Sequence, residues 1–292
     1  MLKLGFIGAG TVGNALAIGL NNKSYRVTAV SSRSQSSSFK LSQAVIGCEC
    51  FKNNQDVADN CDLVFITTPD DAIASVVSEI QWHNEQSVIH CSGADSTDIL
   101  EPARKEGAYI GAFHPLQTFA SVNQAIENIP GSTFAIEAEE PLLGTLKDMA
   151  TSLGGYCIEL KASDKVIYHT AAVIACNYLV TLVKMATDLW QNFNIPQSQA
   201  IRALLPLMRG TLHNIDTIGM PECLTGPIAR GDIETVKKHI NALQVSFPIS
   251  LSTYKELGLQ TIPIALAKGK INKQQADKLQ TILNNGTNLN IS

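Results

Sequence analysis

The sequence lacks any concentrated block of positive charge. Its 22 lysine and arginine residues are outnumbered by 26 aspartate and glutamate residues, which gives a formal net charge of −4, and the basic residues form no dense run. Nucleic acids and anionic membrane surfaces both attract clustered positive charge. We therefore expect neither as a partner, and a small-molecule ligand fits the composition better.

The cysteines and histidines are not spaced like metal ligands. The seven cysteines are odd in number and include no Cys-x-x-Cys pair, and the six histidines include no i, i+4 pair. Structural zinc sites and disulfide frameworks both depend on such regular spacings. We expect no metal, and most of the cysteines should be small buried apolar residues.

The sequence is also short of long apolar runs. The apolar stretch at the N-terminus is too short for a secretory signal, and no later stretch reaches the roughly 18 apolar residues that cross a bilayer. These absences predict a cytoplasmic protein.

The first half of the chain contains an alternation of short apolar runs and segments of helical period. The helical segments are 12–20, 71–80 and 98–106. This alternation is typical of an α/β domain with a doubly wound, mainly parallel sheet covered by helices. The runs expected to form strands are 4–7, 26–30, 63–67, 87–90, 108–113, 133–136 and 156–160.

The second half is predicted to be all-α. A long apolar segment at 165–193 opens it, and every later stretch with a clear period has helical spacing. We place the domain boundary near residue 160, with an α/β domain at 1–160 and a helical substrate and dimerisation domain at 161–292. The later helical stretches are 198–214, 232–243, 246–257 and 273–283.

Three local signals refine this outline. Asp232 stands where it can cap the start of a helix, and Gly258 stands where a helix can stop. The serine-rich stretch 31–38 predicts a flexible loop after the second strand.

A Gly-x-Gly-x-x-Gly string occupies residues 8–13, between the first predicted strand and the first predicted helix. In that setting Gly8 permits a tight turn, Gly10 lets the backbone approach a pyrophosphate, and Gly13 lets helix and strand pack closely. Thr11 and Val12 begin the helix whose N-terminal amide groups can bind the anion. The string predicts a Rossmann domain that binds a dinucleotide.

The end of the second predicted strand indicates which dinucleotide is bound. NAD sites usually carry an acidic residue there, whereas this chain has Ser31, Ser32 and Arg33. Serine hydroxyls and an arginine fork can both bind a 2′-phosphate. We therefore predict NADP(H) as the cofactor; the alternative is a solvated loop arginine beside unrelated serines.

Two further loops should lie at the same edge of the sheet. Thr68 and Pro69 follow the third predicted strand, and Ser92 follows the fourth. Ligands of open α/β sheets bind at the carboxyl ends of the strands. We expect Thr68 and Pro69 to line the nicotinamide side of the site and Ser92 to contact cofactor or substrate. Plain turns are the alternative for both loops.

Several strings of the sequence together resemble one family of Rossmann-type oxidoreductases. The family belongs to the β-hydroxyacid and 6-phosphogluconate dehydrogenase-like superfamily, and its C-terminal domain was long of unknown function. Some bacterial members are ketopantoate reductases, so the resemblance implies reduction of a 2-oxo acid for pantothenate and coenzyme A biosynthesis. The strings, which span nearly the whole chain, are 8–13, 68–70, 90–94, 111–119, 168–172 with Asn177, and 224–232.

One position departs from the pattern of the superfamily. Its hydroxyacid dehydrogenases carry a lysine one turn before an asparagine, and Val173 takes the lysine position if Asn177 is that asparagine. Asn177 would hold the substrate oxygen or the nicotinamide amide. The candidates for the missing proton donor are His169, two turns before Asn177, and His114, at the carboxyl edge of the sheet. The alternative for both is an imidazole that only stabilises the fold.

Three functions are compatible with these observations. The first is NADPH-dependent reduction of a 2-oxo acid, with ketopantoate as the named substrate. The second is reduction of a C=N bond, as in pyrroline-5-carboxylate reductases. This reaction needs no strong acid at the lysine position, so Val173 is easier to explain. The third is a non-catalytic NADP-binding regulatory protein. The apolar length of 166–190 also predicts a homodimer through the helical domain.

Overall fold

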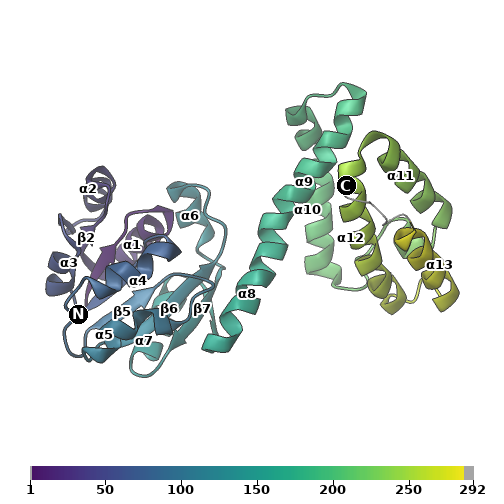
Figure 1. Cartoon of the computed structure of the whole chain (residues 1–292). Coiled ribbons are helices and arrows are strands. Elements are labelled where there is room, and N and C mark those ends of the chain that lie inside the picture. Colours follow the sequence, from purple (N-terminus) through teal and green to yellow (C-terminus); the bar gives the residue numbers. More distant parts are fainter. Residues whose placement is uncertain (1, 286–292) are drawn as a thin grey trace, which may run out of the picture. The chain divides into compact units, whose positions relative to one another are not determined.

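The structure is a computed structural model that describes residues 2–285. The chain forms two compact units, and the division falls after Tyr178 (Figure 1). The predicted boundary near residue 160 matches the end of the last strand instead. The first unit reaches further along the chain because the helix after that strand begins with Lys165, which is buried against the backbone of Ser92.

An eight-stranded sheet forms the centre of the first unit. The strands are β1 (Lys3–Ile7), β2 (Arg26–Ser31), β3 (Glu49–Cys50), β4 (Leu63–Ile66), β5 (Ser87–His90), β6 (Tyr109–Leu116), β7 (Thr133–Ala138) and β8 (Tyr156–Glu159). They lie in the order β3-β2-β1-β4-β5-β6-β7-β8, and only the β6–β7 pair is antiparallel. The predicted fold class, a doubly wound and mainly parallel sheet followed by a helical region, is confirmed.

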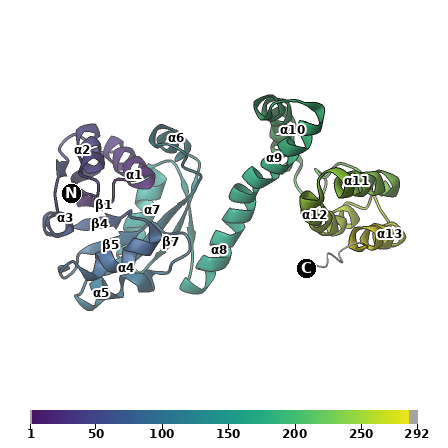
Figure 2. The same ribbon diagram turned by 45° about the horizontal axis from the view of Figure 1, so that its top comes forward.

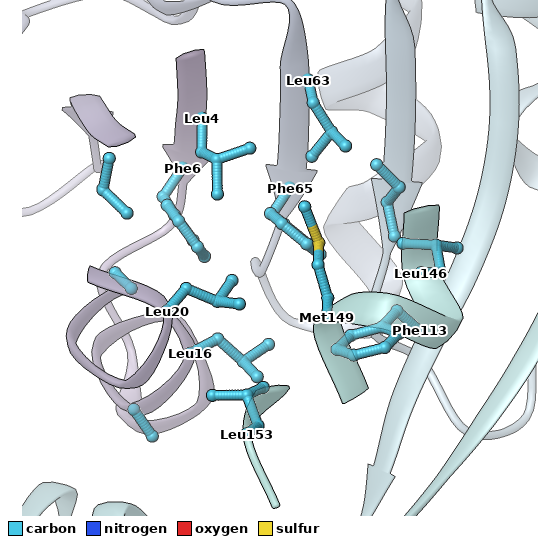
Figure 3. Close-up of a cluster of buried hydrophobic side chains, with 14 of the residues drawn as sticks. Leu4, Phe6, Leu16, Leu20, Leu63, Phe65, Phe113, Leu146, Met149 and Leu153 are labelled. Carbon is cyan, nitrogen blue, oxygen red and sulfur yellow. The ribbon is translucent and has the colours of Figure 1, made fainter. Parts of the chain in front are cut away.

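Helices cover both faces of this sheet. On one face, the stacked rings of Phe6 and Phe65 have centroids 5.0 Å apart and belong to the same core as Leu16 and Met149 (Figure 3). On the other face a separate core includes Val77. The helices of the first unit are α1 (Thr11–Asn22), α2 (Gln35–Ala44), α3 (Asn54–Asn60), α4 (Asp70–Ser78), η1 (Thr97–Leu100), α5 (Glu101–Lys105), α6 (Val122–Asn128), α7 (Leu142–Ser152), η2 (Ala162–Asp164), α8 (Lys165–Ala172) and the π-helix η3 (Val173–Asn177).

The strand register brings several loops to one edge of the sheet. Ile7 of β1 pairs with Ile66 of β4, Ile66 pairs with His90 of β5, and His90 pairs with Ala112 of β6. The loops after β1, β4 and β5 therefore begin side by side at the carboxyl edge. His114 does not follow its strand as predicted, because β6 continues to Leu116 along its antiparallel neighbour β7.

The serine-rich stretch 31–38 is not a loop throughout, and the prediction was wrong there. Ser31 still belongs to β2, and α2 begins at Gln35. Residues 35–38 are helical because Ser38 and Leu41 of the same helix are buried beside the sheet, which outweighs the weak helix propensity of serine.

The second unit is built from helices. They are α9 (Tyr178–Leu189, whose first residue lies in the first unit), η4 (Trp190–Phe193), α10 (Gln197–Ile218), η5 (Ile228–Arg230), α11 (Ile233–Ser246), α12 (Pro248–Ala267) and α13 (Lys273–Asn284). The last three lie together around a core that includes Val236, Ile262 and Leu279 (Figure 2). The all-helical prediction for this part of the chain is confirmed over the described residues.

Of the two helix ends predicted in this unit, the one at Asp232 is confirmed and the one at Gly258 is wrong. Asp232 caps α11 as predicted, because its carboxylate accepts a hydrogen bond from the backbone N–H of Thr235 at 3.1 Å. Gly258 does not stop a helix but lies inside α12. A Cβ at this position would come within 2.9 Å of the Leu283 side chain, so the glycine serves close packing of α12 against α13.

One helical run is long and apolar enough to cross a membrane. Residues 162–193 reach a mean hydropathy of 1.7, and none of their most apolar window is buried. The sequence analysis found the long apolar segment 165–193 but no unbroken apolar stretch of that length, because polar residues such as Thr170 and Asn177 interrupt it. A mean hydropathy tolerates such interruptions. Length and composition alone do not establish a membrane span, and Lys165 and His169 of the same run face the carboxyl edge of the sheet.

Candidate functional site

The glycine-rich turn after β1 is shaped by two close backbone approaches. Gly8 has a φ of +111°, and a Cβ there would lie 2.6 Å from the carbonyl carbon of Thr67. A Cβ on Gly13 would lie 2.5 Å from the carbonyl oxygen of Gly8. The Thr67 hydroxyl donates to that same oxygen at 2.8 Å. Both positions therefore require glycine.

The start of α1 offers an open, electropositive surface. Gly10 precedes the helix and is exposed, and no atom lies within 4 Å of the position that its Cβ would take. The first turn, which begins with Thr11 and Val12, contains no acidic residue. The unpaired amide groups and the helix dipole can therefore bind a pyrophosphate here.

The residues after β2 divide into a buried and an exposed part. Ser31 is buried, and its hydroxyl donates to the side-chain oxygen of Asn54 at 2.8 Å. Its hydrogen is thus already engaged within the protein. Ser32 is half-buried and Arg33 is exposed, which leaves these two residues to bind a 2′-phosphate. The contact with Asn54 could not be foreseen, since nothing in the sequence links the two positions.

The loops after β4 and β5 are joined by hydrogen bonds. The Ser92 hydroxyl lies 2.9 Å from Asp70 Oδ2 and 2.9 Å from Asp95 Oδ2 and donates to these carboxylates. Ser92 is buried and holds the two loops together, and its predicted contact with cofactor or substrate stays a prediction. The hydroxyl of Thr68 is buried and has no partner among the described residues, which makes it available to a ligand. The exposed Pro69 precedes α4.

Two imidazoles converge on the glycine that follows Ser92. A Cβ on Gly93 would lie 2.7 Å from Nδ1 of His169 and 2.9 Å from Nε2 of His114. The two rings are nearly perpendicular, with centroids 6.2 Å apart. The structure therefore brings both predicted proton donors together, and only glycine at position 93 leaves room for them.

Besides its contact with His169, His114 has a hydrogen-bond partner that the sequence analysis missed. Its Nδ1 lies 2.8 Å from the hydroxyl of Tyr168, which belongs to α8. Burial, together with the charge of Lys165 and the neighbouring His169, lowers the pKa of His114 to about 4. Burial raises the pKa of Tyr168 to about 12. At neutral pH the pair is therefore a neutral imidazole and a neutral phenol.

Lys165 is the second residue that sequence reasoning passed over. Its side chain is fully buried, and Nζ donates to the backbone oxygen of Ser92 at 3.2 Å. Burial lowers the pKa of this ammonium, while the carboxylate of Glu137 acts in the opposite direction. A buried lysine with a lowered pKa is a frequent feature of functional sites.

His90 completes the group of titratable side chains at this edge. Its Nδ1 accepts a hydrogen bond from the backbone N–H of Ser92 at 3.1 Å. Burial and the charge of Lys165 lower its pKa to about 3, so the ring is neutral with its hydrogen on Nε2. Nε2 is buried without a partner among the described residues.

Asn177 is not joined to this group by any hydrogen bond in the described part of the chain. It is exposed and ends the π-helix η3, which begins at Val173. Single π-helical turns occur often at functional sites. The predicted role of Asn177 stays a prediction.

Two domain families match the chain. Residues 1–115 match the Rossmann-like domain, and residues 132–261 match a domain of unknown function, DUF2520. A search of curated proteins finds no match.

Solved structures share the fold along most of the chain. A Thermotoga maritima protein is 24% identical, with a TM-score of 0.73, 91% of this chain and 99% of that chain covered. A candidate NADP oxidoreductase from Bacteroides fragilis is 23% identical, with a TM-score of 0.71 and coverages of 92% and 98%. A Plasmodium falciparum pyrroline carboxylate reductase with NADP bound is 16% identical, with a TM-score of 0.57 and coverages of 96% and 98%. The chain thus resembles a Rossmann-like domain in its first part and DUF2520 in its second, and it shares the fold of these solved structures.

Proposed function

We propose that this protein is an NADPH-dependent reductase of a small 2-oxo acid, with ketopantoate as the first substrate to test. The observation that carries the proposal is the convergence of His114 and His169 on Gly93, at the sheet edge that also holds the glycine-rich turn. Dinucleotides and their substrates meet at this edge in doubly wound folds. The choice of ketopantoate rests on the family resemblance of the sequence.

The residues after β1 and β2 fit a phosphorylated dinucleotide. The open amide groups at Gly10 and Thr11 can bind the pyrophosphate, and Ser32 with Arg33 can bind the 2′-phosphate. The unpartnered hydroxyl of Thr68 lies one loop further along the edge. Bound NADPH would supply the hydride. Two proteins of the same fold are described with NADP, which supports the choice of this cofactor.

Reduction of a carbonyl adds a hydride to carbon and a proton to oxygen. With Val173 in place of the usual lysine, the protein must deliver that proton from another group. His169 has a buried Nδ1 with no partner in the described part of the chain, and His114 reaches the same position. These two side chains are therefore our candidates for contact with the substrate oxygen.

Reduction of a C=N bond is the second candidate function. An iminium carbon that receives a hydride becomes an amine without a proton donor at the position of Val173. The likeness to a pyrroline carboxylate reductase favours the same reaction class. Both candidates use the same cofactor, so only the substrate distinguishes them.

The test is NADPH oxidation by the purified full chain, followed at 340 nm, with a panel of 2-oxo acids that includes ketopantoate and a panel of cyclic imines. We expect saturable turnover with a 2-oxo acid and little with the imines. Turnover confined to the imines would replace the first proposal with the second. Tight NADPH binding without turnover on either panel would instead support a regulatory protein.

A further inference from the structure

The hydrogen bond between His114 and Tyr168 determines which ring nitrogen carries a hydrogen. Burial raises the pKa of Tyr168 to about 12, so its hydroxyl keeps its hydrogen, and the only partner of that hydroxyl in the described residues is His114 Nδ1. If Nδ1 carried the ring hydrogen, the phenol hydrogen would have no acceptor and Nε2 would have no donor. The arrangement that leaves the fewest unpaired groups has Tyr168 donating to Nδ1.

The opposite side of the ring then carries the hydrogen that faces the site. His114 Nε2 and His169 Nδ1 both lie close to Gly93, on the side where this residue has no side chain. The ring is held edge-on to Tyr168, with an interplanar angle of 89°. A substrate oxygen that reaches these two nitrogens could therefore accept the hydrogen on Nε2.

Burial, together with the charge of Lys165 and the neighbouring His169, keeps the ring of His114 neutral. The groups that face it are Tyr168, Lys165 and His169 from α8 and His90 from β5. The pKa of about 4 means that an imidazolium is scarce at neutral pH, so the ring cannot act as a stored acid on its own. A neutral ring can still donate a proton from one nitrogen, provided that a second group donates a proton to the other nitrogen.

We propose that Tyr168 is the proton source that replaces the missing lysine, and that it acts through the ring of His114. As the hydride reaches the carbonyl carbon, the Nε2–H bond breaks and its proton forms the O–H bond of the product alcohol. The Tyr168 O–H bond breaks in the same step and its proton binds Nδ1. After the product leaves, the Nδ1–H bond breaks and its proton returns to the tyrosinate, while Nε2 takes one proton from solvent, which restores the starting state. This inference rests on the proposed carbonyl reduction.

The kinetic test compares Tyr168→Phe with Tyr178→Phe, a matched change at an exposed tyrosine ten residues further along the chain. We expect Tyr168→Phe to lower kcat by about 100-fold or more, the usual range for loss of a proton donor. The KM for NADPH should stay the same, because Tyr168 is remote from the glycine-rich turn in our assignment. Tyr178→Phe should retain the activity of the unchanged protein.

A second measurement does not depend on turnover. Nitrogen-15 NMR of the labelled full chain reports which nitrogen of His114 carries the hydrogen, with His114→Gln used to assign the signals. We expect the hydrogen on Nε2 and expect Tyr168→Phe to release Nδ1 from its bond. A hydrogen on Nδ1 in the unchanged protein, or full kcat in Tyr168→Phe, would overturn the relay. Absence of turnover in the unchanged protein would instead count against the proposed function.

Discussion

Arg33 is the side chain on which the choice of cofactor depends. It is exposed just after β2, beside the half-buried Ser32. We expect Arg33→Asp to raise the Kd for NADPH by about tenfold or more, because a charge-assisted contact is replaced by repulsion. The Kd for NADH should change much less, since that cofactor has no 2′-phosphate. Isothermal titration with each nucleotide measures both values.

The control for this change is Lys40→Asp, which makes the same change of charge at an exposed position of α2. It should leave the NADPH-to-NADH ratio unaltered. If Arg33→Asp weakened the binding of NADPH and NADH equally, the arginine would stabilise the site as a whole and would not bind the 2′-phosphate.

His90 and His114 make stability depend on pH. Burial lowers their pKa values to about 3 and about 4, well below the value of about 6.5 that histidine has in an unfolded chain. Between these values the unfolded chain binds protons that the folded chain does not bind. The free energy of unfolding should therefore fall as the pH drops below about 6.5, by up to about 1.4 kcal/mol per pH unit for each histidine.

Urea unfolding at pH 7, 6 and 5 measures this dependence. In the double variant His90→Gln, His114→Gln the slope between pH 6 and pH 5 should be clearly smaller than in the unchanged protein. Identical slopes in the two proteins would mean that these imidazoles are not held neutral by the fold.

At the scale of elements, Gly258 determines how closely α12 approaches α13. A Cβ at position 258 would lie 2.9 Å from the Leu283 side chain and 3.4 Å from the Ile228 side chain. We expect Gly258→Val to lower the free energy of unfolding by about 1–3 kcal/mol through overpacking. Gly210 is the matched control, because it lies inside α10 with no atom within 4 Å of a Cβ.

Gly210→Ala should raise stability by about 0.5–1 kcal/mol, as expected for a helix interior. Thermal unfolding of both variants gives the comparison. An increase in Tm for Gly258→Val would show that the two helices are not packed as closely as described.

The sequence predicted the elements whose signals are local. Short apolar runs marked seven of the strands, and the capping chemistry of Asp232 marked the start of α11. The short strand β3 and helices α2, α3, α6 and α7 were missed. For α2, the burial of Leu41 decides the conformation, and that burial comes from residues distant in the sequence.

The candidate site was predictable only in part, for the same reason. Gly8 and Gly13 stand in a recognisable string, whereas Lys165 gains its importance from a contact with Ser92, 73 residues away. Tyr168 meets His114 across 54 residues. Neither contact can be identified without the fold, so the sequence did not single out either residue as part of the site.

At the scale of the whole molecule, we propose that the protein is a homodimer through its helical region. Large apolar side chains of α10 are exposed, among them Leu207 at 68% and Ile218 at 56%. Exposed apolar residues at helical spacing favour an interface. We expect light scattering to give twice the monomer mass.

The double change Leu207→Glu, Ile218→Glu should shift the protein to the monomer. Val245→Glu, at an apolar position of α11 that is still more exposed, should not. A monomer in the unchanged protein at micromolar concentration would contradict the dimer, and the face of α10 would then need another explanation.

The most direct test of the whole account is a calorimetric titration of the full-length protein with NADPH, repeated with NADH. The account requires a saturable isotherm with one nucleotide per chain and clearly tighter binding of the phosphorylated form. A flat trace with NADPH, at protein concentrations where the fold is intact by circular dichroism, would contradict it.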